Sequence, residues 1–194
     1  MKVCGLTGGV GMGKSTAAAF FLSQGARVVD TDEIARQIVQ PGQPALAEIR
    51  REFGGEILLP DGSLNRVGLA HVVFNDAAAL KTLEAILHPR IRERWSAQVE
   101  RLRQENCPLA VVVIPLLFET QAEGVFDKII CVACSPSSQH ERLQARGWSD
   151  DQIRRRIAAQ LPVEQKLARS HFVVWSEGRP EVHRRQITQI LENL

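Results

Sequence analysis

Short apolar runs alternate along the chain with longer segments whose apolar residues recur every three or four positions. The short runs predict buried strands near residues 2–6, 26–29, 110–114, 128–134 and 172–175. The run at 110–114 is apolar without alternation, which is typical of a strand covered on both faces. Because amphipathic segments separate these strands, the pattern predicts an α/β fold with an open parallel sheet.

From residue 40 to residue 106 the pattern changes and predicts mainly helices, separated by turns. Near the end of this stretch, Pro89 falls inside a long helical tract, and we expect it to break or kink that tract into segments near 77–87 and 90–105. A mainly helical insertion between sheet strands is typical of a substrate-binding subdomain.

Residues 8–15 read Gly-Gly-Val-Gly-Met-Gly-Lys-Ser and fit the phosphate-binding pattern G-x-x-x-x-G-K-[ST]. The loop lies between a predicted strand and a predicted helix, where glycines let successive backbone N–H groups point at phosphate oxygens. Lys14 is expected to reach the β- and γ-phosphates, and the Ser15 hydroxyl is expected to ligate Mg²⁺. The predicted nucleotide contacts are Gly8, Gly9, Gly11, Met12, Gly13, Lys14, Ser15 and Thr16.

Two carboxylates, Asp30 and Asp32, follow the second predicted strand. Ligands of parallel α/β sheets bind beyond the carboxyl ends of the strands, so we expect this pair beside the glycine loop. Asp32 is placed to cap the next helix. It is also placed to orient a hydroxyl acceptor and take its proton during phosphoryl transfer, and we favour this second interpretation.

Five arginines, at 142, 146 and 154–156, lie on two predicted helices joined at Gly147-Trp148. We expect Arg142 and Arg146 to share a helix face, because they are four residues apart. The cluster predicts a helical lid over residues 136–164 that brings positive charge to a transferring phosphoryl group. A solvated basic surface is the alternative interpretation.

Composition excludes several other classes of protein. The formal net charge of +2 argues against a protein built to coat nucleic acid. The longest apolar run, residues 109–118, is too short to span a membrane, so we expect no membrane partner and a cytoplasmic location. Cys131 and Cys134 have a C-x-x-C spacing, but residues three apart on a strand face opposite sides, so we expect all four cysteines to be reduced and buried.

Several short motifs occur in a fixed order over nearly the whole chain. They are residues 5–15, Asp30-Thr31-Asp32, Leu64-Asn65-Arg66, Leu87-His88-Pro89, Pro115-Leu116-Leu117-Phe118-Glu119, Arg142-Leu143 with Arg146, and Arg156-Ile157-Ala158-Ala159-Gln160. Together they resemble the dephospho-CoA kinase family. The resemblance implies ATP-dependent phosphorylation of the 3′-hydroxyl of dephospho-CoA, which gives coenzyme A and ADP and is the final step of coenzyme A biosynthesis.

The resemblance also implies a P-loop NTPase fold, a three-layer sandwich with a central parallel sheet, a helical acceptor-binding insertion and a helical lid. The chain of 194 residues is then a single kinase domain. Its nucleotide core covers about residues 1–34, 107–135 and 165–194, its insertion 35–106 and its lid 136–164. The expected substrates are ATP, with Mg²⁺, and dephospho-CoA, while the oligomeric state stays open.

Residue roles follow from the same resemblance. Asp32 matches the catalytic base, Lys14 the phosphate-binding lysine and Arg142 a lid arginine, and we also assign Arg146 to the nucleotide. The acceptor-binding region is matched by Arg66, His88 and Arg92. The chain departs from the family pattern at Ser170-His171 and Ser176, in a region that lies near the adenine in the family.

Two alternatives remain at this stage. One is a P-loop kinase for another small hydroxyl acceptor, such as a nucleoside or nucleotide. The other is an ATPase or regulatory module without an acceptor, which would usually carry an acidic residue directly at the end of the third strand. Here Pro115 to Phe118 intervene before Glu119, which weakens that second alternative.

Overall fold

The computed structural model describes residues 1–194, with the side chain of residue 74 left outside the description. Packing divides the chain into two compact units. The first consists of residues 1–29 and 99–194, and the second consists of residues 30–98. The predicted insertion had the somewhat different bounds of 35 and 106.

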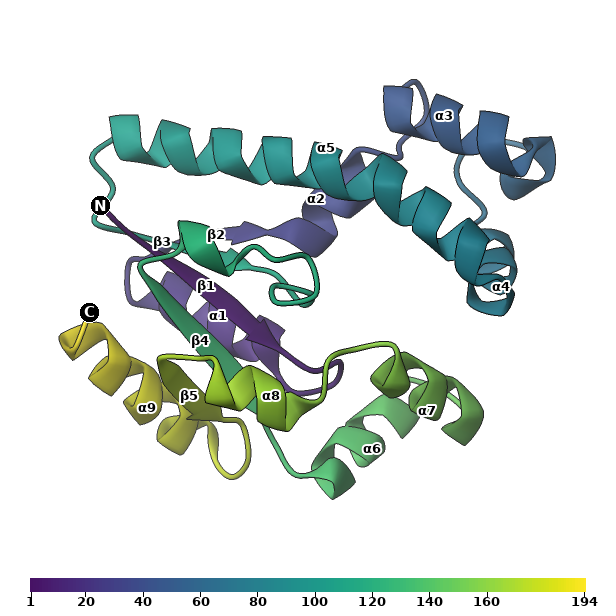
Figure 1. The fold of residues 1–194 in the computed structure, drawn as a ribbon. Helices are drawn as coiled ribbons and strands as arrows, with labels where there is room; N and C mark the ends of the chain where they lie inside the picture. Colours follow the sequence, from purple (N-terminus) through teal and green to yellow (C-terminus); the bar gives the residue numbers. More distant parts are fainter. The chain divides into compact units, whose positions relative to one another are not determined.

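A five-stranded sheet organises the first unit (Figure 1). The strands are β1 (Lys2–Gly8), β2 (Arg27–Asp30), β3 (Leu109–Val113), β4 (Lys128–Ala133) and β5 (Phe172–Trp175). They lie in the order β2-β3-β1-β4-β5. Strand β1 runs parallel to both β3 and β4, and β4 runs parallel to β5. The predicted α/β fold with a parallel sheet is therefore confirmed.

Alternation along the strands divides the side chains of the sheet between two covering layers. The helices of the first unit are α1 (Lys14–Ser23), α6 (Pro136–Gln144), α7 (Asp150–Ala158), α8 (Val163–Ala168) and α9 (Pro180–Glu192). On one face, Leu6 and Ile130 belong to a buried cluster with Phe21 of α1 and Ile187 of α9. On the other face, α8 contacts β1 and β4. The first unit is thus a sandwich of three layers.

Helices α6 and α7 contact each other and carry the predicted lid (Figure 1). The N-terminus of α7 has the expected capping box, in which Ser149 and Gln152 each bind the backbone of the other. Helix α6 ends at Gln144. Arg146 therefore lies in the turn beyond the helix, and the expectation that it shares a helix face with Arg142 is wrong.

The second unit is helical. Its elements are α2 (Thr31–Gln37), α3 (Pro44–Phe53), the short 3-10 helix η1 (Gly55–Ile57), α4 (Arg66–Asn75) and the larger part of α5 (Ala77–Gln104). Pro89 lies inside α5, which is one continuous helix. Of the two expected outcomes, a break is therefore wrong and a kink remains. Figure 1 shows α5 changing direction along its length, as a proline inside a helix requires. No helix in the described part of the chain, α5 included, has the length and apolar character needed to cross a membrane.

The four cysteines are free and buried, as predicted. Burial raises the pKa of the Cys4 and Cys131 thiols to about 11. Both thiols are therefore protonated at neutral pH, which makes them poor nucleophiles and poor metal ligands.

Candidate functional site

The glycine loop joins the end of β1 to the start of α1. Gly13 has a φ of 90°, and a Cβ at this position would lie 3.0 Å from the side chain of Ser176. Both the conformation and the available space therefore favour glycine. The N–H groups of Gly11 and Gly13 have no acceptor among the described residues. Open N–H groups at the start of a helix are suited to binding phosphate oxygens.

Two side chains at the start of α1 have the properties expected of a nucleotide site. The ammonium of Lys14 donates to the carbonyl oxygens of Gly8 and Gly9, at 2.8 and 2.9 Å, and is thereby held over the loop. Ser15 and Thr16 are exposed. The Ser15 hydroxyl has no partner among the described residues. Mg²⁺ prefers oxygen ligands and is usually held by few protein groups together with substrate phosphates, so Ser15 fits the predicted role.

Arg142 contacts the loop through Ser176. Its Nη1 donates to the Ser176 hydroxyl at 2.8 Å and its Nη2 donates to the Ser176 carbonyl at 2.6 Å. The same hydroxyl donates to the carbonyl of Met12 at 2.7 Å. A hydroxyl both accepts and donates, as this relay requires. The predicted lid arginine is thus held beside the loop by a residue at which the chain departs from the family pattern.

The residue after Ser176 fixes the start of α6. Glu177 Oε1 accepts hydrogen bonds from the backbone N–H of Ser135, at 2.7 Å, and from its hydroxyl. Glu177 Oε2 accepts from Trp175 Nε1 at 3.0 Å. These bonds, that of the Ser135 hydroxyl foremost, lower the pKa of Glu177 to about 2. The carboxylate is therefore ionised at all physiological pH values and holds α6 to the end of β5.

The other arginines of the predicted lid lie in different environments. Arg146 is exposed and has no partner among the described residues. Arg155 pairs with Asp151 at 2.9 Å on the surface, and the guanidinium of Arg156 lies 4.3 Å from the ring centre of Trp148. Exposed ion pairs contribute little to stability. Arg155 thus fits the alternative of a solvated basic surface, whereas Arg146 is available to bind an anion.

Asp30, and not Asp32, caps α2. Its Oδ1 accepts a hydrogen bond from the backbone N–H of Asp32 at 2.8 Å. The interpretation of Asp32 as the helix cap is therefore wrong. The Asp32 carboxylate is exposed on the first turn of α2 and remains the candidate base, and its proximity to the glycine loop stays a prediction.

The predicted acceptor residues Arg66, His88 and Arg92 belong to the second unit and lie on two helices. Arg66 is exposed at the first position of α4, just after the cap residue Asn65. His88 is half-buried and Arg92 exposed, both on α5. None of the three has a hydrogen-bond or ion-pair partner among the described residues, so each is available to a ligand.

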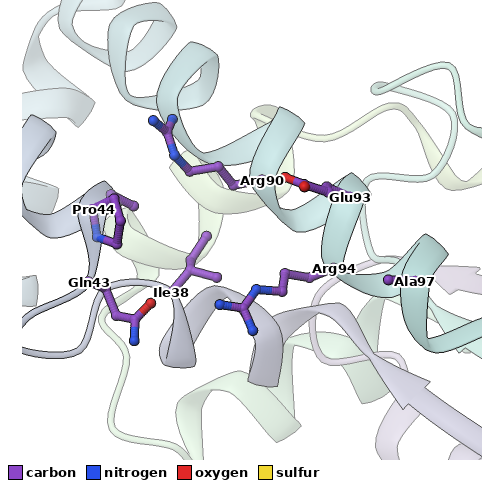
Figure 2. A pocket seen from close by; sticks show the side chains of 8 residues that line it. Ile38, Gln43, Pro44, Arg90, Glu93, Arg94 and Ala97 are labelled. Carbon is purple, nitrogen blue, oxygen red and sulfur yellow. The ribbon is translucent and has the colours of Figure 1, made fainter.

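The second unit also contains a cavity of about 300 Å³. Its walls are Ile38, Gln43, Pro44 and Ala45 on one side and Arg90, Glu93, Arg94 and Ala97 of α5 on the other. Figure 2 shows Arg94 extending toward Ile38 and Gln43. Arg66, His88 and Arg92 are not among its walls. The cavity and the predicted acceptor residues are thus separate candidates for the binding of the acceptor.

The sequence pattern of the dephospho-CoA kinase family matches residues 2–181. The chain belongs to the dephospho-CoA kinase family. A dephospho-CoA kinase of Anaeromyxobacter dehalogenans is 45% identical over 195 residues, which cover 100% of this chain and 92% of that protein. Another from Bdellovibrio bacteriovorus is 42% identical, covering 99% of this chain and 96% of the relative. The predicted enzyme class is confirmed, and a nucleoside or nucleotide kinase is not favoured.

Solved structures are similar to this chain over its whole length. The protein TT1252 from Thermus thermophilus superposes with a TM-score of 0.85 at 35% identity, covering 100% of this chain and 97% of that structure. The dephospho-CoA kinase from Campylobacter jejuni has a TM-score of 0.73 at 27% identity, with coverages of 100% and 97%. A shikimate kinase from Acinetobacter baumannii shares the fold at 14% identity, with a TM-score of 0.52 and coverages of 100% and 92%.

In this member of the dephospho-CoA kinase family, a buried polar network lies next to the glycine loop. Sequence analysis did not identify it. Lys166 is fully buried, with its Nζ 2.7 Å from Glu119 Oε1 and 2.9 Å from the Pro115 carbonyl. The same carbonyl accepts from the hydroxyl of Thr7, which lies just before the loop. Glu119 Oε1 also accepts from the N–H of Leu161, at 2.8 Å. Glu119 ends a recognised motif, but nothing local distinguishes Lys166 from a surface lysine.

Proposed function

We propose that the protein transfers the γ-phosphoryl group of ATP to the 3′-hydroxyl of dephospho-CoA, giving coenzyme A and ADP in the cytoplasm. The family match over residues 2–181 is the observation that carries this proposal. The open N–H groups of Gly11 and Gly13 support it, because they provide a binding site for the phosphates of the donor.

The donor half of the site follows from the loop. The N–H groups of Gly11 and Gly13 bind phosphate oxygens, and Lys14 exchanges the carbonyls of Gly8 and Gly9 for the β- and γ-phosphates. Ser15 would hold Mg²⁺, which when bound neutralises charge on the β- and γ-phosphate oxygens. These contacts stabilise the charge that shifts onto ADP as the terminal bond breaks.

Asp32 acts as the general base. Its exposed carboxylate accepts the proton of the acceptor hydroxyl while the new O–P bond forms and the bond between the β- and γ-phosphates breaks. Arg66, His88 and Arg92 bind the acceptor. The guanidinium groups of Arg66 and Arg92 form strong charge-assisted bonds with its phosphates. Arg142 and Arg146 supply positive charge from the lid.

The proposal is tested with a panel of acceptors and the purified protein. ADP formation is measured with MgATP alone and with added dephospho-CoA, nucleosides or nucleotides, and the phosphorylated product is identified by mass spectrometry. Dephospho-CoA should be the acceptor that is converted. Turnover of a nucleoside without turnover of dephospho-CoA, or hydrolysis that no acceptor changes, would overturn the proposal.

The role of Asp32 is tested separately. Asp32→Asn should lower kcat by at least about 10², while the Kd for MgATP and the unfolding midpoint stay near those of the wild-type protein. Asp30→Asn is the control, because asparagine also caps helices and keeps the acceptor oxygen for the N–H of Asp32. Normal turnover by Asp32→Asn would remove the assignment of the base.

A further inference from the structure

Both backbone polar groups of Val10, in the middle of the glycine loop, are bound by side-chain amides. The N–H of Val10 donates to Gln160 Oε1 at 2.8 Å, and Gln139 Nε2 donates to the carbonyl of Val10 at 2.7 Å. Gln139 lies on α6 and is buried, whereas Gln160 is half-buried and follows α7. The two glutamines thus hold Val10 from opposite ends of the lid segment.

The hydrogen bond of Gln160 does not involve the N–H groups that are proposed to bind phosphate. The N–H of Met12 is bound to the carbonyl of Gly9 within the loop, at 3.2 Å. The N–H groups of Gly11 and Gly13 remain without an acceptor among the described residues. Because Gln160 binds the N–H of Val10, it is placed to orient the peptide between Gly9 and Val10. This peptide directly precedes the one that carries the open N–H of Gly11.

The backbone next to Gln160 is itself fixed. The N–H of Leu161 donates to Glu119 Oε1 at 2.8 Å, and Glu119 is paired with the fully buried Lys166. The side chain of Gln160 therefore extends from an anchored backbone, as a side chain must if it is to restrain the loop. Glu119 and Gln160 end two of the motifs that define the resemblance to the family, and this geometry connects them.

We propose that Gln160 is a positioning residue, which holds the Val10 peptide so that the donors of Gly11 and Gly13 stay directed at the nucleotide phosphates. It acts through the loop and does not touch the substrate. The proposal rests on the proposed function only in taking a nucleotide as the ligand of the loop, so it is independent of the acceptor.

Gln160→Met tests the proposal, because methionine has a similar length and no acceptor for the N–H of Val10. Binding of MgADP is measured by calorimetry without acceptor, and steady-state kinetics are measured with both substrates. We expect the Kd for MgADP and the KM for ATP to rise about three- to tenfold, which is the scale of one hydrogen bond. The KM for dephospho-CoA should stay unchanged.

Amide hydrogen exchange gives a direct readout of the contact. In the nucleotide-free protein, the Val10 amide should exchange faster in Gln160→Met than in wild type, while amides of the central strand β3 keep their rates. Gln165→Met is the matched control, since Gln165 is an exposed glutamine of α8 whose side chain has no partner among the described residues. If Gln160→Met does not fold, Gln160→Asn shortens the same amide, and the same changes are expected of it.

Two results would overturn the proposal. An unchanged MgADP affinity despite faster exchange at Val10 would show that the contact does not position the donors. A tighter affinity would show that the Gln160 oxygen competes with phosphate for the N–H of Val10. Because MgADP binding needs no acceptor, an error about dephospho-CoA would leave this measurement intact and would appear only in the acceptor panel.

Discussion

Replacing the buried Lys166 with methionine should lower the free energy of unfolding by about 2–4 kcal/mol. Methionine fills most of the volume but removes both bonds of the ammonium, to Glu119 and to the Pro115 carbonyl. Glu119 would keep only the N–H of Leu161, and its Oε2 is already buried without a partner among the described residues. Removing one member of a buried ion pair typically costs about 3–5 kcal/mol. The Glu119 side chain is 20% exposed, so water relieves part of this cost.

Urea unfolding followed by circular dichroism measures the effect, and an unchanged m-value shows that only stability has changed. Lys81→Met is the control, because Lys81 is exposed and has no partner among the described residues, and it should lie within about 0.5 kcal/mol of wild type. Lys166→Met/Glu119→Gln should recover much of the loss, because the glutamine is neutral and keeps an acceptor for Leu161. A loss below about 1 kcal/mol for Lys166→Met, or a double variant no more stable than Lys166→Met, would refute this account.

Three further predictions concern the acceptor, the lid and pH. Arg92→Ala should raise the KM for dephospho-CoA about tenfold or more while Arg94→Ala changes it little, and the reverse would place the acceptor in the cavity of the second unit. Arg142→Ala should lower kcat by at least about tenfold, a larger effect than its loss of stability, whereas lost stability with normal turnover would reduce Arg142 to an anchor for Ser176. Burial, with the charge of Arg142 adding to it, lowers the pKa of His183. The unfolded chain then takes up a proton that the folded protein does not, so unfolding free energy should fall as pH drops below about 6.5. The fall should be smaller in His183→Phe, and equal slopes in the two proteins would contradict the assignment.

Secondary structure was predictable where local pattern decides it. Strand β5 has the predicted bounds, because an apolar run between turn residues leaves little choice of register. At Pro89 the local rule left a break and a kink open. Ile86 and Trp95 are buried on either side of the proline, and this packing preserves one helix at the cost of a bend. The cap fell on Asp30 because α2 begins at the residue directly after β2, which leaves no connecting loop.

The site was predictable only where its residues are consecutive. The glycine loop carries its own signal, since its glycines act through local backbone geometry and Lys14 and Ser15 directly follow them. The partners of that loop lie far away in sequence, with Ser176 bound to Met12 across 164 residues and Gln160 bound to Val10 across 150. A serine after a strand or a glutamine after a helix has no local feature that predicts such a contact, so only the fold reveals it.

The glycines of the loop and the distant side chains that bind it have opposite effects on the freedom of its backbone. Glycine gives the backbone access to conformations such as the φ of 90° at Gly13, but it also leaves the unfolded and folded loop with more conformations than other residues would. Gln139 and Gln160 remove that freedom at Val10, and Arg142 removes it at Met12 through Ser176. All three side chains come from the lid segment or its end. The donors proposed to meet the phosphates are therefore held by the segment that carries Arg146, so we predict that a change in this segment alters nucleotide binding even where it touches no phosphate.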